Sequence, residues 1–160
     1  MKPALLILPC NPCVRLGDYS LCQNWRVVLK HVGHLVQSSL LDLAAVDSCK
    51  PGIVAWGEER RLTWCDRSPR WDTRYGKNPW LLELLTEAVT ADLRKLATEY
   101  KLLASYVNVK AYKLALKTAA KTAEIELLDL GPPASNPLSY NKHAKELAET
   151  LKRHIKSVQR

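Results

Sequence analysis

The sequence predicts an α/β domain of three layers, in which helices cover both faces of a four-stranded, mainly parallel sheet. Short apolar runs of strand length alternate with longer segments whose apolar residues recur at helical spacing. Alternating strands and helices, joined by right-handed crossovers, build a parallel sheet that is covered on both faces. The 160 residues are 47% hydrophobic and 25% charged, a globular balance, so we expect one domain over residues 1–160 with its own core.

Four short runs are predicted to be strands, at residues 4–9, 40–46, 101–107 and 124–130. The first, ALLILP, is apolar throughout, which is typical of a strand that is buried on both faces. It stops at the turn Pro9-Cys10-Asn11-Pro12-Cys13, and the fourth run stops at Gly131-Pro132-Pro133. Ligands of such sheets bind beyond the carboxyl ends of the strands, so the loops that follow the strands are the candidate site.

Four segments have helical periodicity, at residues 25–37, 79–99, 109–122 and 141–157. Asn24, Asn78 and Asn108 precede three of them and are suitable N-caps. Pro79 would then occupy the first helical position of the second segment, where its fixed φ is favourable.

Residues 52–78 have no sustained periodicity and are predicted to be a long Trp/Arg-rich loop. Aromatic rings stack on unpaired bases and arginines contact phosphates, so this composition suits unstacked or flipped bases. The expected nucleic-acid contacts are Arg60, Arg61, Arg67, Arg70, Trp71 and Arg74. The alternative is a loop that its tryptophans attach to the core, with its arginines paired to nearby acids.

The formal net charge of +8 indicates a polyanionic partner, foremost a nucleic acid, DNA or RNA. No acidic residue lies between Glu99 and Glu124. Four lysines at spacing i, i+3, i+7 and i+11 share one helical face there: Lys110, Lys113, Lys117 and Lys121. We expect Lys110, Lys113 and Lys117 to contact phosphates; the alternative is a merely basic surface.

Cys10 and Cys13 form a C-x2-C pair that, with Cys49 and Cys65, could hold zinc or an iron–sulfur cluster. The alternative is four small buried thiols. His31 and His34 share a helical face, but no carboxylate at metal-ligand spacing accompanies them, which favours a structural or surface role.

No apolar run approaches the ~18 residues that span a bilayer, so we expect no membrane partner and a cytoplasmic protein. In that compartment the cysteines would be reduced or metal-bound.

Three loops, taken in order, resemble motifs of the uracil-DNA glycosylase superfamily. Residues 8–13 (LPCNPC) stand where that superfamily has a Gly-x-Asn-Pro-Gly motif. Residues 48–51 (SCKP) are similar to a Lys-Cys-Arg-Pro segment of its iron–sulfur branch, and Cys65 follows at a similar distance to the fourth cluster ligand. Residues 134–139 (ASNPLS) match the second half of its His-Pro-Ser-Pro-Leu-Ser motif. The chain is also similar to the glycosylase-like domain of archaeosine-synthase-type proteins of tRNA modification.

The resemblance implies a glycosylase-like fold that excises or modifies a base of DNA or tRNA, with a possible [4Fe-4S] cofactor. Asn11 would position a water or contact the base, Ser135 and Asn136 would hold the flanking phosphate or stabilise developing charge, and Ser139 would contact the nucleic acid. Ala134 stands where the superfamily has its catalytic histidine. That departure favours an alternative, a nucleic-acid-binding or assembly module that has lost the chemistry. A further alternative is a small-molecule nucleotide enzyme.

Overall fold

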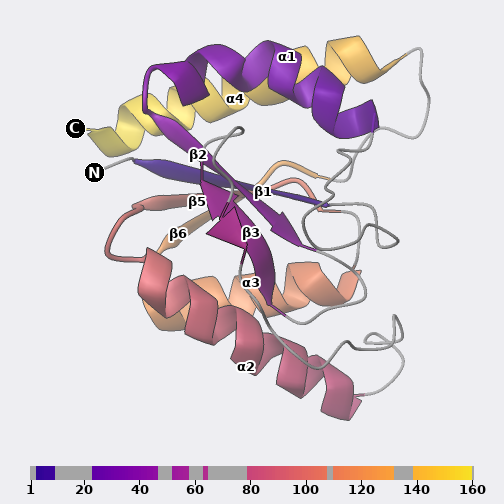
Figure 1. The fold of residues 1–160 in the computed structure, drawn as a ribbon, viewed down its shortest axis with the longest axis vertical. Coiled ribbons are helices and arrows are strands. Elements are labelled where there is room, and N and C mark those ends of the chain that lie inside the picture. The colour runs from indigo at the N-terminus through magenta and orange to yellow at the C-terminus, as the bar shows by residue number, and fades with distance from the viewer. Residues whose placement is uncertain are drawn as a thin grey trace.

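The computed structural model describes residues 3–9, 23–46, 52–57, 63–64, 79–107, 110–131 and 139–159. Within these ranges six strands and four helices follow one another along the chain (Figure 1). The strands are β1 (Ala4–Pro9), β2 (Leu41–Val46), β3 (Ile53–Gly57), β4 (Thr63–Trp64), β5 (Leu102–Ser105) and β6 (Glu126–Asp129). The helices are α1 (Gln23–Gln37), α2 (Pro79–Leu96), α3 (Lys110–Ala123) and α4 (Tyr140–Gln159).

All six strands form one sheet in the order β4-β3-β2-β1-β5-β6. The strands β2, β1, β5 and β6 are parallel, whereas β3 and β4 pair antiparallel at the edge beside β2. Because the four parallel strands share a direction, their carboxyl ends lie at one edge of the sheet. At that edge β1 ends with Pro9, β2 with Val46 and β6 with Asp129.

The predicted α/β class and the four predicted strands are confirmed, but the prediction of a four-stranded sheet is wrong. The two additional strands, β3 and β4, lie in the segment 52–78 that was expected to be an irregular loop. Both are short, and β4 has two residues, so they carry no usable periodicity. β3 pairs with β2 and β4 pairs with β3, and local sequence does not specify these partners.

The helices begin and end close to the predicted residues. Pro79 is the first residue of α2, as expected. Asn24 lies inside α1, which begins at Gln23, so its predicted role as N-cap is wrong. Among the described residues no helix is both long enough and apolar enough to span a membrane.

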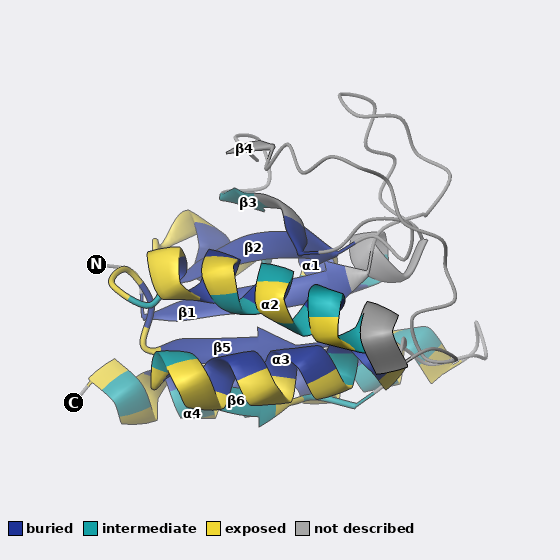
Figure 2. Cartoon of the chain, turned by 90° about the horizontal axis from the view of Figure 1, so that it is seen from below, coloured by how far each residue is buried: buried dark blue, intermediate teal, exposed yellow. Residues whose placement is uncertain are grey.

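Helices cover both faces of the sheet, α1 and α4 on one and α2 and α3 on the other (Figure 1). The side chains of β1 alternate between the two cores: Leu6 and Leu8 pack with the α1/α4 layer, and Leu5 and Ile7 with the α2/α3 layer. All four are fully buried, which explains why β1 is apolar at every position (Figure 2).

Three polar side chains are buried among the described residues, namely Asp42, Asp92 and Ser105. Alternation along β2 and β5 directs Asp42 and Ser105 to the α2/α3 face, and Asp92 belongs to α2 itself. The Tyr100 hydroxyl donates a hydrogen bond to Asp42, and the backbone N–H of Ile53 donates to Asp92 Oδ2 at 2.8 Å. These two carboxylates therefore have structural partners, and Asp92 attaches β3 to α2.

Candidate functional site

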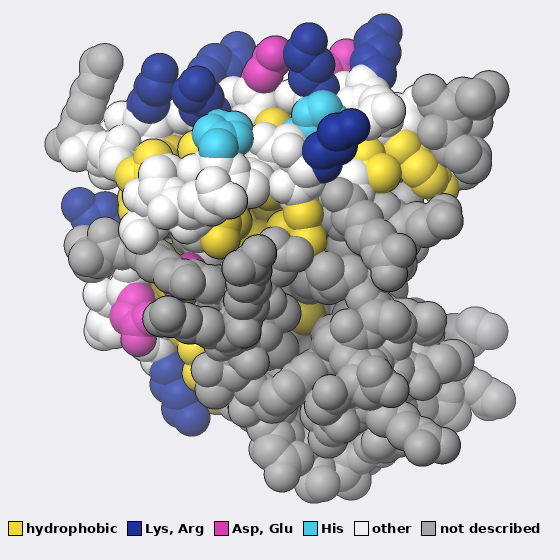
Figure 3. Space-filling model, turned by 45° about the horizontal axis from the view of Figure 1, so that its top comes forward, with side chains coloured by type: hydrophobic (Ala, Val, Ile, Leu, Met, Phe, Trp, Pro, Cys, Tyr) yellow, Lys and Arg dark blue, Asp and Glu magenta, His cyan; other side chains and the backbone are white. Residues whose placement is uncertain are grey.

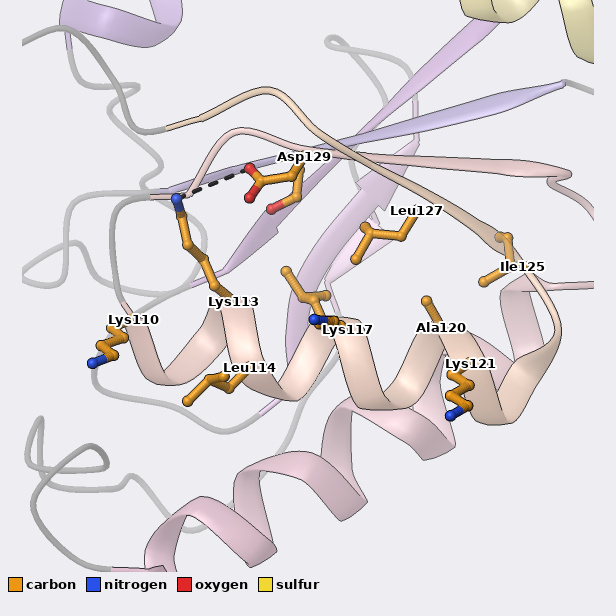
Figure 4. Close-up of a pocket in the computed structure, with 11 residues that line it drawn as sticks. Lys110, Lys113, Leu114, Lys117, Ala120, Lys121, Ile125, Leu127 and Asp129 are labelled. Atoms are coloured by element: carbon orange, nitrogen blue, oxygen red, sulfur yellow. Dashed lines mark ion pairs between the residues drawn. The ribbon is translucent and has the colours of Figure 1, made fainter.

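A cavity of about 630 Å³ lies between α3 and the edge strand β6 (Figure 4). Small-molecule and cofactor sites commonly have volumes of about 300–1,000 Å³. The cavity has a lysine side, an apolar wall and one polar end, and each is produced by a different feature of the sequence.

The lysine side comes from the periodicity of α3. Its buried residues pack against the rest of the α2/α3 layer and are Ala111, Tyr112, Ala115, Leu116, Ala119 and Ala120. The four lysines at 110, 113, 117 and 121 fall between these positions, and all four line the cavity (Figure 4). At 1.5 Å per residue they extend over about 16 Å of helix. The expected common face of Lys110, Lys113 and Lys117 is thus confirmed, whereas their contact with nucleic acid stays a prediction.

The apolar wall is formed by Leu114 and Leu116 of α3 and by Ile125 and Leu127 at β6. Leu114 is 47% exposed and is the one large hydrophobic side chain among the described residues that is exposed to this extent. In Figure 4, Leu127 and Ile125 lie on the strand side of the cavity, across from α3.

The turn that ends α3 positions Ile125 at the far end of this wall. Glu124 has a left-handed backbone, with φ of 57°, and the N–H of Ile125 donates to the carbonyl of Ala120 at 3.0 Å. This is the hydrogen-bond pattern of a Schellman C-cap, which reverses the chain into β6.

The polar end lies at the carboxyl ends of β5 and β6, where Ser105 and Asp129 are register partners. Neighbouring strands are about 5 Å apart, so these two side chains are adjacent on the α3 face. Lys113 Nζ lies 3.9 Å from Asp129 Oδ1, which also accepts a hydrogen bond from the Gly131 N–H at 2.9 Å. An ion pair this exposed contributes at most about 1 kcal/mol to stability.

Ser105 differs from the other buried polar residues. It is only 3% exposed, and its Oγ has no hydrogen-bond partner among the residues that the structure describes. Leaving a buried hydroxyl unpaired costs about 1–3 kcal/mol of stability. Ser105 is among the residues that line the cavity.

A second polar contact joins β5 to α4 near the same edge of the sheet. The Tyr106 hydroxyl lies 2.9 Å from His143 Nδ1, and the two rings are 5.5 Å apart. Ser139, expected to contact nucleic acid, is exposed directly before α4. Neither Ser139 nor His143 lines the cavity.

Most other residues expected at the site lie outside the described ranges, and their roles stay predictions. These are Asn11, Ser135 and Asn136, the arginines at 60, 61, 67, 70 and 74, Trp71, and the cysteines at 10, 13, 49 and 65. In the part of the chain that is described, no three His, Cys, Asp or Glu side chains gather as metal ligands.

Sequence reasoning missed Ser105, Asp129 and Leu127 as site residues. Each was placed in a predicted strand, but their meeting depends on β5 and β6 being neighbours with α3 above them. A single serine in the apolar run LLASYV was the available signal.

The comparisons with known proteins give no further assignment. No family model matches the sequence, and no curated protein or solved structure was found to be similar to the chain.

Proposed function

We propose that this protein binds nucleic acid through the lysine side of α3. The observation that carries the proposal is the cavity, whose lining among the described residues includes four lysines and a single carboxylate, that of Asp129. Phosphate contacts from lysine supply most of the sequence-independent affinity for nucleic acids. The stripe of about 16 Å would follow on the order of five phosphates of one strand, at about 3.4 Å per nucleotide along a duplex.

The test measures the salt dependence of binding to a labelled 20-nucleotide strand and to its duplex by fluorescence anisotropy. The variant replaces Lys110, Lys113 and Lys117 by Gln. We expect the slope of log K against log salt to become less steep by about 2 for the single strand, because each lost phosphate contact removes about 0.7.

A charge-matched control replaces Lys142, Lys145 and Lys152 of α4, on the other face of the sheet, by Gln. Both triple variants lower the formal net charge from +8 to +5. The proposal predicts a clear change of slope in the α3 variant and little change in the α4 variant. Equal changes would show that only overall charge matters. Displacement of the strand by poly-glutamate of equal charge at equal concentration would instead favour an acidic polypeptide as partner.

The second candidate function is enzymatic: the protein excises or modifies a base of the nucleic acid that it binds. The specific observation in its favour is that β1 and β6 are parallel and separated only by β5, so the chain leaves both strands at the same sheet edge toward 10–22 and 132–138. Those segments contain Asn11, Ser135 and Asn136, and the resemblance to glycosylases gives them their proposed roles. A parallel core with helices on both faces is compatible with that fold.

The reaction is tested by release of free base from strands that contain uracil or hypoxanthine, and from modified tRNA. We expect release by the wild-type protein and loss of release in Asn11→Ala. Salt-sensitive binding with no release of base from any of these substrates would show that the protein binds nucleic acid but does not catalyse the reaction.

A further inference from the structure

We infer that the polar end of the cavity is a nucleotide subsite that selects a base with an exocyclic amino group. The inference rests on the proposed nucleic-acid binding, because it uses the same cavity, and it is separate from the proposed base reaction, whose uracil and hypoxanthine substrates carry no exocyclic amino group. It adds a specific ligand to what would otherwise be a general phosphate contact.

The Ser105 hydroxyl has no hydrogen-bond partner among the described residues. The other two buried polar residues of the described chain, Asp42 and Asp92, have partners within the protein. Ser105 is equally buried, has no partner among the described residues and lines the cavity. A hydroxyl can both donate and accept, so it suits the edge of a heterocyclic base.

Asp129 lies beside Ser105 on the neighbouring strand. The two residues are paired in register on the same face of β5 and β6. Asp129 Oδ1 accepts from the Gly131 N–H, but an ionised carboxylate has acceptor sites on both oxygens and retains capacity for another donor. A carboxylate only accepts, so it favours an amino group such as N4–H₂ of cytosine over a carbonyl such as O4 of a uracil-type ring.

Apolar and basic side chains line the rest of the cavity around Ser105 and Asp129. Leu127, which is partly exposed, provides apolar surface for one face of a flat ring. Lys113 and Lys117 stand on the opposite side of the cavity, on α3, where they can bind the phosphate of the same nucleotide. Figure 4 shows Lys113 reaching toward Asp129, so base-binding and phosphate-binding groups meet at one end.

The test uses isothermal titration calorimetry with CMP, UMP and ribose 5-phosphate. CMP and UMP differ at ring position 4, which carries an amino group or a carbonyl, and at N3, which accepts in cytosine and donates an N–H in uracil. Ribose 5-phosphate reports the phosphate alone. We expect CMP to bind about 10-fold more tightly than UMP, because a hydrogen bond to a charged group is among the stronger ones. UMP in turn should bind more tightly than ribose 5-phosphate.

Two variants assign the effect to residues. Asp129→Asn should abolish the difference between CMP and UMP, with Glu126→Gln on the same strand as the charge-matched control. Ser105→Ala should weaken CMP and UMP alike by about 3- to 10-fold, since the hydroxyl can bond groups that both rings share. Thr122→Ala, which removes an exposed hydroxyl of α3 that does not line the cavity, should have no effect.

Free and polymeric sources of the nucleotide are separated with oligo(dC), oligo(dU) and an abasic strand of equal length. Tighter binding of oligo(dC) than of CMP, with oligo(dU) and the abasic strand weaker, identifies a nucleotide within a strand. Equal affinity for CMP and oligo(dC) identifies the free nucleotide.

The inference is overturned if CMP, UMP and ribose 5-phosphate bind alike or not at all, or if Ser105→Ala and Asp129→Asn leave the order of affinities unchanged. In that event, a flattened salt slope in the triple lysine variant of α3 would still support nucleic-acid binding. Loss of both effects would reject the proposed function as well.

Discussion

The two helical layers of this protein are built on the same sheet but differ in what they bury. The α1/α4 layer covers its face with an almost entirely apolar core, in which Leu6, Leu43 and Leu151 are fully buried. The α2/α3 layer also has a large apolar core and contains all three buried polar residues of the described chain. Buried polar groups cost stability unless they are paired, and of these three only the Ser105 hydroxyl has no partner among the described residues.

The two layers also differ in the charge of their exposed helical surfaces. α4 has five basic residues but also Glu146 and Glu149, and Figure 3 shows basic and acidic side chains side by side over the α1/α4 layer. α3 has four lysines and no acidic residue. The formal charges of the two helices are therefore +3 and +4, not counting histidine. α3 combines one sign of charge with the cavity of about 630 Å³, so the arrangement of the lysines distinguishes the two helices better than their number does.

The largest predicted effect tests whether both layers are equally necessary for folding. Leu151→Ala in α4 and Leu85→Ala in α2 each remove a fully buried side chain, and each should lower the free energy of unfolding by about 2–5 kcal/mol. Urea denaturation measures this, with Leu114→Ala at the exposed position as the control. A loss below about 1 kcal/mol for either core variant would show that its layer is not closely packed.

Removing a buried polar bond should have a smaller but clear effect. Tyr100→Phe leaves the buried Asp42 without the phenol donor and should cost about 1–3 kcal/mol in urea denaturation. Tyr106→Phe breaks the half-buried bond to His143 in the other layer and should cost less. A larger loss for Tyr106→Phe would contradict the difference between the layers.

The same bond predicts a pH dependence. Burial, and next the hydrogen bond to Asp42, raise the pKa of Tyr100 above its ordinary value near 10. A raised pKa in the folded state means that the neutral phenol stabilises the fold fully below about pH 10, and that this contribution falls as the pH rises above that value. Tyr100→Phe should therefore lose less stability than the wild type between about pH 9 and 11. Parallel losses in both proteins would contradict this assignment.

Making α4 resemble α3 in charge gives a sharper test of the surface comparison. Glu146→Gln with Glu149→Gln leaves α4 with basic residues alone and raises the net charge by two. If the cavity is needed, nucleic-acid affinity at low salt should rise less than about 3-fold, with no steeper salt slope. A slope steeper by about 1 or more would mean that a basic helix alone is sufficient.

The smallest predicted effect distinguishes Ser105 from its buried neighbours. Because its hydroxyl has no partner among the described residues, Ser105→Ala should change the free energy of unfolding by less than about 0.5 kcal/mol, or increase it. A loss similar to that of Tyr100→Phe would indicate that Ser105 has a structural hydrogen bond and would remove the argument for a ligand.

Local sequence patterns predicted the four parallel strands, the four helices and the single lysine face of α3, because the periods of 2 and 3.6 residues act over neighbouring positions. They failed for β3 and β4, two short segments that become strands by pairing with β2 and with β3, respectively. The meeting of Ser105 with Asp129, and the cavity over them, were decided by strand order and register. Strand order and register depend on how buried side chains from distant parts of the chain pack together, and only the tertiary structure determines that packing.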